Sequence, residues 1–212
     1  MLEPDWGGDA DAAVRVVAAS ELWNTNRLVD VIGVLLKVAA LTIAGRMLAH
    51  AGSAWARVGQ PFLVLMAALG ASAIATGAAM KAMADTWAGA EGNAKASYLA
   101  AFDALVSTTE VLFFVAFLAL GLYLAAFAAA ILADGVFARW IGWAAAVAAV
   151  LMICGTLLTI VSEPAFLIVL AGYALFLVVV VAVGVSMWRQ AATYVPATSR
   201  HPSVDPIMVP KS

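Results

Sequence analysis

The chain has 212 residues, of which 65% are hydrophobic and 11% are charged, and its formal net charge is −2. Soluble domains are about half apolar and a quarter charged, so this composition predicts an integral membrane protein rather than a soluble one. A transmembrane β-barrel is excluded because the apolar runs are continuous and do not alternate with polar residues. The small net charge, without a basic cluster, gives no sign of nucleic-acid binding.

The first 26 residues are an acidic outer leader. Residues 1–12 are rich in acids and glycine. Residues 13–26 carry apolar side chains at helical spacing, with Val14, Val17 and Trp23 among them, and predict a short interfacial helix. No basic segment followed by an apolar run and a small-residue cleavage site is present, so we expect no signal peptide.

Five apolar runs follow, each near the ~20 residues needed to cross a ~30 Å hydrocarbon core. We expect spanning helices at about 27–48, 61–84, 98–132, 140–161 and 164–188. The segment 85–97 contains several glycines and predicts a loop. The proline-rich tail 189–212 predicts a disordered segment. The predicted fold is therefore all-α, a polytopic bundle of five transmembrane helices over 27–188 with a short interfacial helix before it.

The distribution of Lys and Arg near the ends of the spans predicts an orientation. It favours the N-terminus outside and the C-terminus in the cytoplasm, with the protein in the inner (plasma) membrane of the cell. Tryptophans would then mark both interfaces. Trp55, Trp140, Trp143 and Trp188 are expected at the inner one, and Trp23 and Trp87 at the outer one.

Small residues repeat at four-residue spacing in two spans. Span two has Ala71, Ala75 and Ala79, with Ala73 and Gly77 beside them. Span four has Gly142 with Ala146, and Ala145 with Ala149. Such spacing lets helix backbones approach closely in lipid. The high alanine content of the chain is an equally good explanation of the pattern.

Polar residues recur on one face of two spans. Span three carries three polar residues, Asp103, Ser107 and Glu110, at steps of four and three residues. This spacing places them on one side of a helix. Span one carries a similar set, and Lys81 lies near the outer end of span two. The full set is Asn26, Asp30, Lys37, Lys81, Asp103, Ser107 and Glu110.

The charged residues have the same spacing on the two spans: the number of residues from Asp30 to Lys37 equals the number from Asp103 to Glu110. If spans one and three are neighbours, Asp30 would face Asp103 and Lys37 would face Glu110 one layer deeper. A charge at the bilayer centre costs about 2.5–3.5 kcal/mol, so pairing or hydration is favoured. Two interpretations stay open: ion pairs and wet headgroup contacts that are only structural, or a polar cavity that opens to the outer face and has a function.

Three segments carry a resemblance to a known group. They are AASELWNTNRLVD at 18–30, FFVAFLALGLYLAA at 113–126 and GVFARWIGW at 135–143. They resemble a group of uncharacterised bacterial multi-pass membrane proteins, a domain family of unknown function, over about residues 13–190. Such proteins usually begin with one more helix, which is absent from this chain. The resemblance implies a multi-pass fold and no particular activity.

Three functions fit these features. The first is an accessory or binding protein of the membrane, with the seven-residue polar cavity taking a small-molecule or lipid ligand. The second is a secondary transporter or proton-coupled carrier that uses Asp103 and Glu110, although no broken helices or repeats are visible. The third is a membrane enzyme with an intramembrane carboxylate as acid or base. We predict no cofactor, no metal and no nucleic-acid partner. The expected partners are the lipid bilayer and other protein chains, in a homo- or hetero-oligomer.

Overall fold

The computed structural model describes residues 10–193, and within that part the chain is all-α, as predicted. Six α-helices follow one another, with one 3-10 turn at Glu163–Ala165 before the last. They are α1 (Ala10–Ala19), α2 (Trp23–His50), α3 (Ala54–Ala88), α4 (Gly92–Asp134), α5 (Arg139–Thr159) and α6 (Phe166–Thr193). The five helices α2 to α6 are long and apolar enough to cross a membrane, which fits a multi-pass membrane protein.

Several helix boundaries differ from the prediction. Helix α6 continues to Thr193, five residues into the predicted disordered tail, and the rest of that tail and residues 1–9 lie outside the described residues. Helix α3 begins at Ala54, where the Ser53 side chain accepts a hydrogen bond from the Ala56 backbone N–H. This cap fixes the start, and Pro61, expected at the helix start, lies inside the helix. The predicted loop 85–97 is largely helical, because α3 continues to Ala88 and α4 starts at Gly92. Apolar side chains buried against α1, described below, explain why this segment stays ordered.

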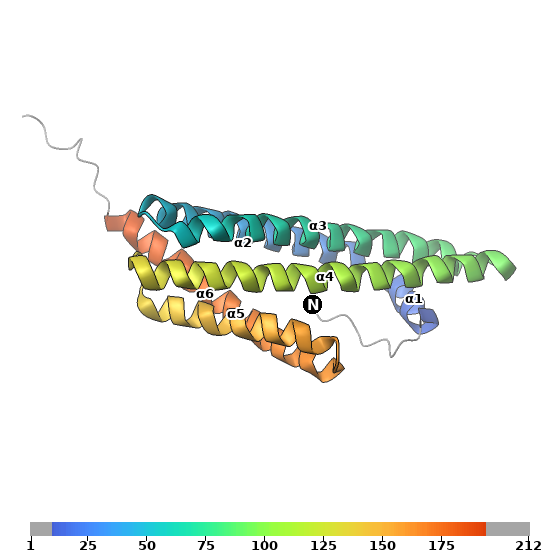
Figure 1. The fold of residues 1–212 in the computed structure, drawn as a ribbon. Helices are drawn as coiled ribbons and strands as arrows, with labels where there is room; N and C mark the ends of the chain where they lie inside the picture. Colours follow the sequence, from blue (N-terminus) through green and yellow to red (C-terminus); the bar gives the residue numbers. More distant parts are fainter. Residues whose placement is uncertain (1–9, 194–212) are drawn as a thin grey trace, which may run out of the picture.

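Helices α3 and α4 form the central pair, and the other helices pack around them (Figure 1). Helix α2 packs mainly on α3 and touches α4 only slightly. Helix α5 packs along the other side of α4, and α6 packs on α5 while also contacting α2. The first and third spans are thus separated by the second over most of their length.

The central pair projects past the α5–α6 connection at the end where α1 lies, here called the α1 end (Figure 1). Helix α5 has 21 residues, or about 31 Å, which matches a ~30 Å hydrocarbon core. Helix α4 has 43 residues, or about 64 Å. A bilayer that fits α5 therefore leaves several turns of α3 and α4 outside it.

Two separate hydrophobic clusters hold the molecule together. The larger one joins α2 to α6 around Tyr123, Phe127 and Phe176. The smaller one, here called the α1 cluster, joins α1 to the projecting turns of α3 and α4. It contains Ala13, Val14, Val17, Trp23, Met80, Ala84, Trp87 and Phe102. The apolar side of α1 is thus buried against protein, not laid on a membrane surface.

Large apolar side chains are exposed along the spans, as expected of surfaces that face lipid. At the end opposite α1, Trp55, Trp140, Trp143 and Trp188 are all more than half exposed. This arrangement fits an aromatic belt at one interface. The predicted second belt is wrong, because Trp23 and Trp87 are buried in the α1 cluster.

Candidate functional site

Helix α1 is fastened to α3 by Lys81. Its ammonium donates a hydrogen bond to the Ala18 carbonyl oxygen at 2.9 Å and pairs with Asp85 at 2.6 Å. Carbonyls of the last helical turn have no partner within their own helix, so a lysine there stabilises the helix end. Lys81 therefore has a structural role at the α1 end, and it forms no ion pair with Asp30 or Asp103 among the described residues.

Trp23 and Arg27 join the start of α2 to α3. The Trp23 indole N–H donates to the Gly77 carbonyl oxygen at 2.7 Å. The Arg27 guanidinium lies 4.6 Å from the centre of the Trp23 ring, and pairs with Asp30 at 3.6 Å. A Cβ on Gly77 would lie 3.0 Å from Arg27 Nε, so the missing side chain makes room for the arginine. Asp30 thus has a cation beside it on its own helix.

Lys37 contacts Tyr173, and its predicted partner Glu110 is not one of its contacts. Its ammonium donates a hydrogen bond to the Tyr173 hydroxyl of α6 and lies 5.1 Å from the centre of that ring. The Tyr173 ring meets Phe117 of α4 edge-on at 6.1 Å, and Phe176 of α6 at 5.6 Å. In residues 10–193 no ion pair joins Lys37 to Glu110. The prediction that Lys37 pairs with Glu110 is therefore wrong, and Tyr173 is the partner of Lys37.

The reason is an axial shift of about one heptad between α2 and α4. Thr76 of α3 bonds to Thr109 of α4 at 2.8 Å, and Arg27 lies against the neighbouring Gly77. These contacts place Asp30 within about one turn of Glu110, and Lys37 near Phe117. Periodicity defines which face of a helix a residue occupies, but it does not define how far two helices slide along each other.

The three polar residues of α4 are exposed on one face of the helix. Asp103, Ser107 and Glu110 make no hydrogen bond or ion pair with any residue that the structure describes. Glu110 lies about one turn beyond the level at which α5 ends, and Asp103 about 15 Å beyond it. Asn26 is partly buried on the first turn of α2. Of the seven predicted residues, Lys37 and Lys81 join helices, Asp30 pairs with Arg27 on its own helix, and Asp103, Ser107 and Glu110 form an open face of α4.

Sequence reasoning missed the residue that contacts Lys37. Tyr173 is a lone hydroxyl-bearing ring in a long apolar run. This isolated hydroxyl is the feature of the sequence that could have identified it as a polar contact within the spans. A buried or lipid-facing tyrosine hydroxyl needs a partner, and a lysine at similar depth can supply one. Asp103, Ser107 and Glu110 offer two carboxylates and one hydroxyl on one exposed face, which can bind a partner through hydrogen bonds and charge.

The fold and these contacts define a class: a polytopic helical bundle of the membrane-spanning kind, with a projecting helical pair at one end. Comparison of the chain with protein-family models, curated proteins and solved structures finds no match. The resemblance to a bacterial multi-pass family therefore stays a prediction.

Proposed function

We propose that this chain is a membrane-embedded binding or accessory protein, whose recognition surface is the open face of α4 with Asp103, Ser107 and Glu110. One observation carries the proposal: these three polar side chains are exposed together on the projecting part of α4 and have no partner within the described chain. Lys81 and Trp23 nearby donate to backbone carbonyls and so join helices, whereas these three side chains remain available to a partner.

The projecting part is also well braced. Helix α1 covers α3 and α4 there, and Val14 and Val17 are at most 1% exposed. A rigid helix presents side chains more precisely than a loop does, which suits a binding surface. Among the described residues the cations divide evenly: Arg46, Arg57, Arg139 and Arg189 lie near the end opposite α1, and Arg15, Arg27, Lys81 and Lys95 lie near the α1 end. Arg200 and Lys211, which follow the last span in the sequence, favour an outside α1 end and a cytoplasmic C-terminus in the plasma membrane.

The transporter and enzyme alternatives receive less support. The transporter uses Asp103 and Glu110, and the enzyme uses Glu110 or Asp30, as a titrating group in the hydrocarbon core. Asp103 and Glu110 lie beyond the level that α5 reaches. Carboxylates in contact with water need no proton coupling to be tolerated there.

The test is site-specific photo-crosslinking in intact cells. A photoreactive residue at Ser107 should give one discrete protein adduct, because the surface contacts a defined partner. The same residue at Val150, which is 60% exposed on α5, should give none, because lipid surrounds that position. The charge reversal Glu110→Lys should abolish the Ser107 adduct at unchanged expression, whereas Asp134→Lys at the other end should not. Uptake of a solute that depends on Glu110 and is lost in Glu110→Gln would instead establish a transporter.

A further inference from the structure

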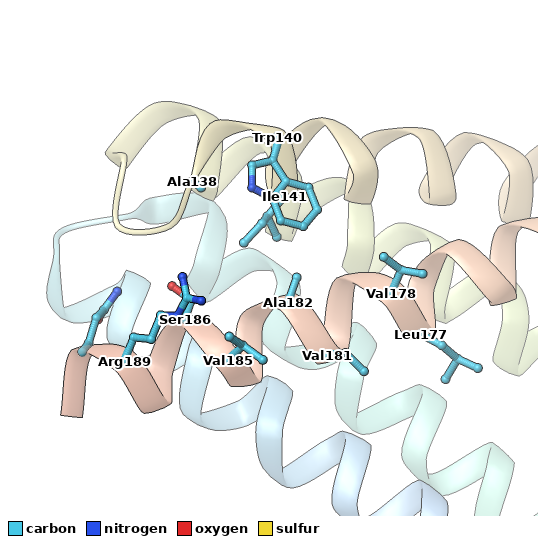
Figure 2. Close-up of a pocket in the computed structure, with 11 residues that line it drawn as sticks. Ala138, Trp140, Ile141, Leu177, Val178, Val181, Ala182, Val185, Ser186 and Arg189 are labelled. Carbon is cyan, nitrogen blue, oxygen red and sulfur yellow. The ribbon is translucent and has the colours of Figure 1, made fainter. Parts of the chain in front are cut away.

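A groove of about 900 Å³ lies at the opposite end of the bundle from α1, between the start of α5 and the last turns of α6. Figure 2 shows Trp140 reaching into the gap from α5, while Ser186 and Arg189 lie at its end on α6. Val178, Val181 and Val185 continue along α6 and are between 44% and 64% exposed. The groove is independent of the open face of α4.

The groove is lined by apolar side chains along most of its length and by polar side chains at one end. The lining residues of α6 run from Leu177 to Gln190, and the stretch from Leu177 to Arg189 is about 18 Å long. That is slightly more than half of a ~30 Å hydrocarbon core, or one leaflet. The apolar part thus has the length of an acyl chain, and its polar end has the depth of a lipid headgroup.

The charge at the polar end is positive. Arg189 lines the groove, Arg139 begins α5 beside it, and neither forms an ion pair with a residue of the described part. Helix α5 has no side-chain cap at Ala138 and no acid in its first turn. Its first backbone N–H groups and helix dipole therefore add to the attraction for an anion.

We propose that this groove binds one anionic phospholipid, with the phosphate at Arg189 and the start of α5 and one acyl chain along Val178, Val181 and Val185. Charge complementarity selects this occupant, because basic pockets between spanning helices favour anionic headgroups. A neutral phospholipid would fill the apolar part equally well and gain nothing from Arg189. The Trp140 ring at the same depth is typical of the headgroup region.

Native mass spectrometry of the purified full chain tests the proposal. Phosphatidylglycerol and phosphatidylcholine with identical acyl chains are titrated separately, and bound lipids are counted. We expect one phosphatidylglycerol to bind at least about fivefold more tightly than phosphatidylcholine, the effect of one basic side chain at a membrane surface. Arg189→Gln should remove that preference.

The matched control is Arg57→Gln, an exposed arginine toward the same end on α3 that does not line the groove. It should keep the preference for phosphatidylglycerol. Ala182→Trp, which fills the apolar part, should remove the tight site for both lipids. Equal affinity for the two lipids, or equal losses in Arg57→Gln and Arg189→Gln, would overturn the proposal. A dimer mass that excludes lipid would show that a second copy covers the groove, and would overturn it too.

Discussion

Lys37 shows how a span can hold a cation without a carboxylate. The Tyr173 hydroxyl accepts one of its hydrogen bonds, and the Tyr173 ring in turn packs edge-on against Phe117. The contact also links α2 to α6, two helices that otherwise meet little. At the residue scale, Lys37 therefore fastens one side of the bundle.

Removing the acceptor should cost more than removing the whole pair. Tyr173→Phe leaves the Lys37 ammonium without its hydroxyl, so we expect the free energy of unfolding to fall by roughly 1–3 kcal/mol. The double variant Lys37→Met with Tyr173→Phe should recover most of that loss, because no charge remains in the apolar region. Unfolding in mixed detergent micelles measures both values. Glu110→Gln is the control and should change stability by less than about 0.5 kcal/mol; a loss as large as that of Tyr173→Phe would restore the Lys37–Glu110 pair.

At the scale of elements, small residues decide which helices approach closely. Of the small residues predicted to pack on α3, Ala73 and Gly77 are buried, whereas Ala71, Ala75 and Ala79 are exposed. On the α5–α6 hairpin, Gly155 and Gly172 allow the closest contacts. A Cβ on Gly155 would lie 2.9 Å from the Val169 backbone nitrogen. Backbone cannot move aside as a flexible side chain can, so this crossing requires glycine.

Gly155→Ala should therefore loosen the hairpin. We expect a loss of about 1–3 kcal/mol in the free energy of unfolding, the usual cost of overpacking. Gly184→Ala on α6 is the matched control, because nothing lies within 4 Å of its Cβ position. There alanine should leave stability unchanged or raise it by up to about 1 kcal/mol, through its better helix propensity. Equal losses in both variants would show that glycine is needed for reasons other than the close crossing.

Helix α1 depends on its buried side to stay attached. Val17 is 1% exposed and its neighbour Val16 is 49% exposed. Val17→Asp places a carboxylate in the α1 cluster, where an unpaired charge is costly. We expect α1 to detach and to uncover Ala84, which is otherwise fully buried.

A cysteine at Ala84, in a Cys154→Ser background, reports this change. Its labelling by a water-soluble maleimide should become at least about tenfold faster with Val17→Asp, as expected from roughly 1.4 kcal/mol or more of lost attachment. Val16→Asp should leave the rate unchanged. Similar rates in the two variants would mean that α1 is not held by this contact.

The whole molecule combines a bilayer-length hairpin with a much longer central pair. The α5–α6 hairpin fixes the thickness of the embedded part, and α3, α4 and α1 form a second, smaller body beyond it (Figure 1). Labelling in intact cells measures this division. With the α1 end outside, Asp103→Cys should react with an impermeant maleimide, whereas Arg57→Cys should react only after the membrane is opened. The reverse pattern would invert the proposed orientation, and no reaction at Asp103→Cys would place the bilayer over the projecting turns.

The amino-acid sequence by itself determined the fold class and the approximate positions of the five spans. Continuous apolar runs of sufficient length have one stable solution in lipid, the helix, because every backbone polar group must bond internally. Positions such as Asp103, Ser107 and Glu110 on one helical face also follow from periodicity alone.

Only the tertiary structure decided which helices are neighbours and how they are aligned along their axes. Span one was expected beside span three, yet α3 lies between α2 and α4 for most of their length. The shift of about one heptad gives Lys37 the partner Tyr173, which lies 136 residues away in the chain. Contacts such as Thr76 with Thr109 and Arg27 with Gly77 set that alignment, because shape complementarity between whole helix surfaces is not visible in the period of either helix.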